Sequence, residues 1–164
     1  MRLIVLALLL LPVAALAQDS EAEAEDVAVV NFWQGDRSRI TEPEVARITD
    51  AAAWFKLWER HAGKNQKPPA VDFDKHMVLA NFLGASTWEK LAVHAVKRTK
   101  TELVFGLEVE PADCCDCTER PHFLMAVLPK SDLKCSVILR VRSGMTVDPR
   151  KDKLLKEFPA TEEK

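Results

Sequence analysis

The segment from Met77 to Leu83 is apolar at every position except Asn81. A strand with one face in water alternates apolar and polar residues, and this segment does not. It is therefore predicted to be a central strand with both faces covered, in a sheet that packs against other layers on each side.

One of those layers is predicted just upstream, as an amphipathic helix that begins after Asp50. The Asp50 carboxylate can accept hydrogen bonds from the free amides of the first turn, and Gly63 is placed to end the helix. The apolar residues between them recur at the spacing of one helix face: Ala51, Trp54, Phe55, Trp58 and Ala62. The helix is predicted to bury this face against the two-faced strand.

Further strands are predicted from runs of β-branched, aromatic and alternating apolar residues, at 27–33, 38–49, 88–98, 100–110, 121–128 and 134–142. The last two are expected to form a hairpin, and 153–158 a single helical turn. Short turns without helical crossovers favour antiparallel pairing. The predicted fold is mainly β (α+β): an antiparallel β-sandwich or open barrel of about seven strands with one packed amphipathic helix.

The first 17 residues have the three parts of a secretory signal peptide. Arg2 supplies the positive charge, 3–11 is an unbroken apolar run, and 15–17 is a small-x-small cleavage site. The run is too short to span a bilayer, so no stable membrane anchor is expected. The sequence predicts an exported protein, periplasmic or secreted. After the signal peptide, the sequence predicts an acidic disordered leader (18–26), one β-rich domain (27–142) and a polar C-terminal tail (143–164).

The charge of the chain argues against two classes of partner. Without Arg2 the chain has 22 basic residues against 25 acidic ones, a formal charge of −3. No run of lysine and arginine concentrates positive charge in one place. Neither nucleic acid nor an anionic membrane is an expected partner of such a surface.

The four cysteines carry the strongest chemical signal. Cys114, Cys115 and Cys117 share a loop bracketed by prolines, and Cys135 lies in the last predicted strand, on the face expected to point into the core. In an exported chain, these cysteines favour structural disulfides. The pairing stays open. A bond between the neighbours Cys114 and Cys115 is strained, and a bond to Cys135 requires the loop to fold back along the sheet.

Metal binding is the alternative interpretation of this cluster. Cys114, Cys115, Cys117 and His122 have the donor types of a tetrahedral zinc or copper site, which makes a periplasmic metal-binding protein the alternative function. A Cys-x-x-Cys redox pair normally lies at a helix N-terminus, and no helix is predicted to follow this loop. If the cysteines form disulfides, no cofactor is expected.

Motifs of catalysis are absent from the sequence. The chain has no Gly-x-Ser-x-Gly, no His-Glu-x-x-His and no glycine-rich phosphate loop, so a non-catalytic protein is expected. Trp88 follows a predicted turn and is flanked by Glu89. If it is exposed, it is a candidate anchor for a protein interface.

Several motifs occur in a fixed order along the chain. They are Trp54 and Leu57-Trp58 in a helix, Pro69-x-Val71-Asp72-Phe73-Asp74, an apolar strand ending in Gly84, Arg120-Pro121-His122-Phe123, and Val127-Leu128-Pro129-Lys130. This order resembles the PrcB-like family of protease-complex accessory subunits, over roughly residues 38 to 142. The family usually has a glycine pair and an aromatic residue after the strand glycine, where this chain has 85–89, Ala-Ser-Thr-Trp-Glu. A family binding surface at that turn is therefore not carried over.

The resemblance implies a function for the expected β-rich domain. Members of the family are small exported domains without catalytic activity, which bind or stabilise partners. This chain is accordingly expected to associate with another exported protein, and to stabilise or restrain a protease if that is the partner. The sequence leaves the oligomeric state open.

Overall fold

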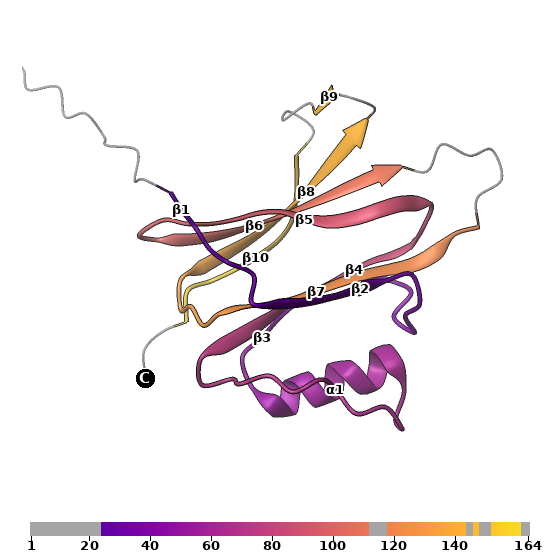
Figure 1. Ribbon diagram of the computed structural model, residues 1–164, viewed down its shortest axis with the longest axis horizontal. Coiled ribbons are helices and arrows are strands. Elements are labelled where there is room, and N and C mark those ends of the chain that lie inside the picture. The colour runs from indigo at the N-terminus through magenta and orange to yellow at the C-terminus, as the bar shows by residue number, and fades with distance from the viewer. Residues whose placement is uncertain (1–23, 112–117, 144–145, 148–151, 162–164) are drawn as a thin grey trace, which may run out of the picture.

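The computed structural model describes residues 24–111, 118–143, 146–147 and 152–161. The chain folds into two packed sheets and one helix (Figure 1). Sheet A contains, in spatial order, β1 (Glu25–Asp26), β5 (Trp88–Arg98), β6 (Glu102–Pro111), β8 (Lys134–Ser143) and β10 (Lys153–Phe158), and β9 (Thr146–Val147) pairs with β8. Sheet B contains β2 (Asn31–Gly35), β7 (Arg120–Pro129), β4 (His76–Ser86) and β3 (Pro43–Ile48). The predicted mainly β fold with one helix is confirmed as a β-sandwich.

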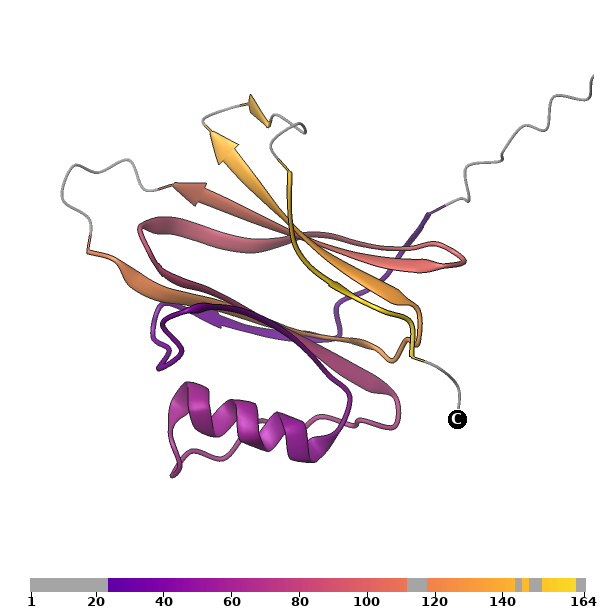
Figure 2. The ribbon, with the colours of Figure 1, turned by 180° about the vertical axis from the view of Figure 1, so that it is seen from behind.

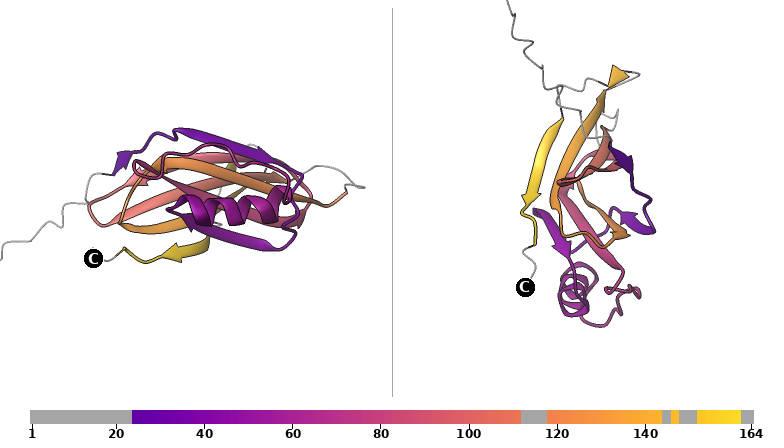
Figure 3. Two further views of the ribbon diagram at one scale, coloured as in Figure 1. Left: turned by 90° about the horizontal axis from the view of Figure 1, so that it is seen from below. Right: turned by 90° about the vertical axis from the view of Figure 1, so that its left-hand side faces the viewer.

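Strand β4 is the predicted two-faced strand. It lies between β7 and β3 in sheet B, and its residues 77–82 are at most 1% exposed. Met77 and Leu79 contribute to the core between the two sheets, whereas Val78 and Phe82 pack toward α1 (Ala51–Ala62). The helix lies across the outer face of sheet B (Figure 3). The prediction that both faces of β4 are buried, one of them against the helix, is therefore confirmed.

The ends of α1 follow from local chemistry. Oδ1 of Asp50 accepts a hydrogen bond from the Ala53 amide at 2.8 Å. At the other end, Gly63 has φ +105°, and its amide donates to the carbonyl of Glu59 at 2.9 Å. A positive φ of this kind favours glycine, so the helix ends where the sequence predicts.

The buried face of α1 differs from the predicted one. Trp54 and Leu57 are 2% and 3% exposed and His61 is 5% exposed, whereas Phe55 is 45% exposed. The prediction that Phe55 belongs to the buried face is wrong. The buried stripe runs through Trp54, Leu57 and His61, and Phe55 lies about 100° around the helix from Trp54.

Strands β7 and β8 do not form the predicted hairpin. They belong to different sheets, and the residues between them cross from sheet B to sheet A. Arg47 on β3 holds this connection by donating to the carbonyls of Ser131 and of Leu133, the latter at 3.1 Å. Strand β8 then pairs with β6 in parallel, and all other described strand pairs are antiparallel. A short connection fits a hairpin and a crossing between sheets equally well, which is why the sequence pattern misleads here.

The folded part extends beyond the predicted bounds of the domain. Residues 25–26, expected in the acidic leader, form β1 and pair with β5. Residues 153–158 form β10 on the outer side of β8, so the predicted helical turn is wrong (Figure 2). Leu155 and Phe158 both pack against the core. A register shift between Leu154 and Lys156 lets a strand present both residues.

Candidate functional site: the outer face of sheet A

The predicted cysteine site is only partly described by the structure. Cys114, Cys115 and Cys117 lie outside the described residues, so their disulfides and their metal site both stay predictions. Cys135 on β8 is 0% exposed and faces the core between the sheets, as predicted. His122 lies on β7, and burial is the main cause that lowers the pKa of its side chain. Among the described residues, no three His, Cys, Asp or Glu side chains gather as a metal site.

The environment of Cys135 predicts low reactivity. Burial raises the pKa of its thiol to about 11, and the thiolate is the species that alkylating reagents attack. We expect Cys135 of the folded protein to resist iodoacetamide at about pH 8 and to react readily once the chain is unfolded without reductant. Mass spectrometry of the tryptic peptides measures both. Rapid labelling of the folded protein would contradict this environment, and resistance after unfolding would place Cys135 in a disulfide.

The predicted interface residues open strand β5. Trp88 pairs with Pro111 of β6 in the register of sheet A. The side chains of Trp88 and Glu89 lie outside what the structure describes, so the role of Trp88 as an interface anchor stays a prediction.

The outer face of sheet A is a candidate site that the sequence reasoning missed. Sheet B has α1 across its outer face, whereas no helix covers that of sheet A in the described part of the chain (Figure 1). A hollow of about 220 Å³ opens there, with Ala95, Val104, Gly106 and Ile138 among its lining residues. Leu154 of β10 pairs with Ile138 and therefore extends the same face with a side chain that is 54% exposed. We call these five residues the open face.

Gly106 keeps the hollow open. A Cβ atom at this position would lie 3.3 Å from the Ala95 carbonyl oxygen and 3.8 Å from Cβ of His94. Any side chain here would occupy the space above the sheet. A glycine at an outward position of an otherwise regular strand was the one sequence signal that could have located the site.

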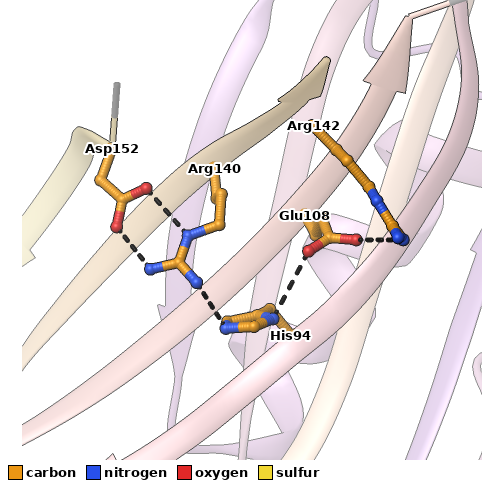
Figure 4. Close-up of polar contacts among 5 residues, drawn as sticks. All are labelled: His94, Glu108, Arg140, Arg142 and Asp152. Atoms are coloured by element: carbon orange, nitrogen blue, oxygen red, sulfur yellow. Dashed lines mark hydrogen bonds and ion pairs between the residues drawn. The ribbon is translucent and has the colours of Figure 1, made fainter. Parts of the chain in front are cut away.

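A chain of polar contacts borders the open face (Figure 4). Asp152 accepts two hydrogen bonds from Arg140, from Nε at 2.9 Å and from Nη2 at 2.7 Å. Nη1 of Arg140 lies 2.6 Å from Nε2 of His94, and Nδ1 of that ring lies 3.5 Å from Glu108. Glu108 in turn contacts Arg142 at 3.5 Å. The chain of contacts links β5, β6, β8 and the residue just before β10.

The donors and acceptors among these groups indicate which ring nitrogen of His94 accepts a hydrogen bond. A guanidinium can only donate, so Nε2 of His94 accepts from Arg140, and the ring hydrogen lies on Nδ1, toward Glu108. The hydrogen bonds from Arg140 hold the pKa of the Asp152 carboxyl below its usual value. Each charged group is thus engaged by a neighbour, and none of the five residues is a Ser, Thr or Cys nucleophile. These contacts hold the polar side chains at the border of the open face in a fixed arrangement.

Comparison of the chain with family models, with curated proteins and with solved structures finds no match. The resemblance to the PrcB-like family therefore stays a prediction. No helix among the described residues has both the length and the apolar character needed to cross a membrane.

Proposed function

We propose that this protein is an exported, non-catalytic domain that binds another exported protein through the open face of sheet A. The observation that carries the proposal is the apolar hollow over Gly106, bordered by Arg140, His94 and Asp152. Export rests on the signal-peptide pattern of residues 1–17. The family resemblance suggests a protease as the partner, and disulfides among the cysteines fit the same oxidising compartment.

The size of the hollow favours a protein partner over a small molecule. Pockets for small molecules usually enclose about 300–1,000 Å³. The hollow has about 220 Å³, which is room for one or two apolar side chains of a partner. Beside it, Arg140 is held by Asp152 and His94, so little side-chain freedom is lost when a partner packs against it. Such a border of ordered polar groups around an apolar centre is the common anatomy of protein interfaces.

Capture experiments with two matched variants test the proposal. The mature protein, starting at Gln18, is immobilised and exposed to the exported protein fraction of its native cells. We expect one dominant partner, whose affinity falls at least about tenfold with Leu154→Glu, because a carboxylate on the open face would lose its hydration against the partner. Phe55→Glu, at a similarly exposed apolar residue on α1, should bind like the wild type. The proposal fails if no partner is captured, or if the two variants behave alike.

A further inference from the structure

Three of the four outermost strands carry the protections that keep sheet edges from pairing with other chains. Sheet A ends at β1 and β10, and sheet B ends at β2 and β3. Strand β1 has only two residues. Strand β10 carries Lys153 and Lys156 and a register shift, and β3 begins with Pro43, which has no amide to donate, and carries Glu44.

Strand β2 has none of these protections. Its residues 31–35, Asn-Phe-Trp-Gln-Gly, include no charge and no proline, and its pairing with β7 has no register shift. The uncharged run is longer than the strand, since it extends from Val27 to Gly35. The lack of charge, proline and register shift leaves this outer strand open to pairing with another strand. The Phe32 amide donates to the neighbouring Asn31 side chain at 2.8 Å, a local contact that does not contribute to this openness.

Exposed apolar side chains lie on this strand and directly before it. Val30 and Phe32 are 53% and 51% exposed, and they are two of only four large apolar residues that are exposed among the described residues. Trp33 between β2 and α1 stacks on Trp54 with ring centres 5.7 Å apart, which anchors the strand. The strand is therefore presented in an ordered form, and a partner would not have to order it on binding.

We infer that β2 pairs with β2 of a second copy of this chain, antiparallel about a two-fold axis, so that two B sheets join into one. Charge favours a second copy, because an uncharged strand can face itself without bringing like charges together. A two-fold axis at Phe32 places the two Phe32 side chains opposite each other and sets Val30 opposite Gln34. Each copy then covers the exposed apolar pair of the other. This surface is separate from the open face, so the inference does not depend on the proposed function.

The short strand sets the expected strength of this dimer. An interface built around five paired residues on each side belongs to the small class of protein interfaces. We expect a dissociation constant in the range of roughly 1–100 µM. The dimer should therefore dissociate on dilution.

Sedimentation velocity of the mature protein, measured between about 1 and 500 µM, tests the inference. We expect the wild type to change from monomer to dimer over this range. Phe32→Lys should weaken the dimer at least about thirtyfold, because the two-fold axis would place two lysines face to face. Phe55→Lys is the matched control and should dimerise like the wild type. Circular dichroism and thermal melting check that both variants are folded.

A photo-crosslinking residue at position 34 tests the register. In the expected dimer it should react with the peptide of the other copy that contains Val30. A wild type that stays monomeric at the highest concentration would overturn the inference. So would a dimer that survives Phe32→Lys, or cross-links from position 34 to a part of the chain other than β2.

Discussion

Replacement of Arg47 by methionine is expected to lower the free energy of unfolding by about 3 kcal/mol. Nη1 of Arg47 donates to the carbonyls of Leu133 at 3.1 Å and of Pro159 at 3.4 Å, and Nη2 donates to the carbonyl of Ser131. One side chain of β3 thus ties sheet B to the crossing between β7 and β8 and to the residues after β10. Methionine preserves most of the packing of the stem and removes all of these donors.

The control for this prediction is Arg60→Met. Arg60 on α1 pairs with Glu44, and its side chain is 56% exposed. An exposed ion pair contributes little, so the loss should stay below about 1 kcal/mol. Urea denaturation of both variants, with the slope compared to that of the wild type, measures the difference. Equal losses in the two variants would show that Arg47 does not hold the sheets together.

The parts of the fold that the sequence predicts well have a local physical cause. Strand β4 is recognisable because a strand buried on both faces needs an apolar residue at nearly every position. Helix α1 is recognisable because Asp50 and Gly63 supply the chemistry of its two ends. These signals lie within the segments themselves and need no knowledge of the rest of the chain.

The sequence does not predict which strands lie next to each other in a sheet. Alternation in β8 shows which of its residues face inward, and Cys135 is correctly placed by it. The same alternation does not say that β8 pairs with β6 in parallel, since any strand with one buried face has that pattern. Sheet membership depends on how the whole sandwich closes, and a contact such as that of Arg47 with Ser131 has no signature in sequence.

The candidate site depends on this pairing. Glu108 lies opposite Arg140 only because β6 and β8 pair in parallel in one register, and Asp152 reaches the same place from the segment before β10. These residues are far apart in the sequence and belong to no motif. Gly106 is recognisable in the sequence as an outward glycine in a strand. That it keeps a hollow open depends on its closeness to Ala95 and His94 of the neighbouring strand β5.

The largest expected effect of a single substitution is that of Trp54→Ala, which should lower the free energy of unfolding by about 4 kcal/mol. Trp54 is 2% exposed between α1 and sheet B. Its ring centre lies 5.7 Å from that of Trp33 and 5.2 Å from that of Trp58. Its Nε1 also donates to the carbonyl of Pro69 at 2.9 Å. Alanine would leave a cavity at this contact and remove the donor to that carbonyl.

Two further variants separate the causes of this loss. Trp54→Phe keeps most of the ring packing and removes the donor to Pro69, so it should cost about 1–2 kcal/mol. Phe55→Ala, one residue along the same helix, should cost less than about 1 kcal/mol, because the Phe55 side chain is 45% exposed. Thermal and urea unfolding of all three variants measure how much each substitution lowers the free energy of unfolding. If Phe55→Ala destabilised the protein as much as Trp54→Ala, α1 would present its originally predicted face to the sheet. The aromatic contact that anchors β2 through Trp33 would then have to be placed differently as well.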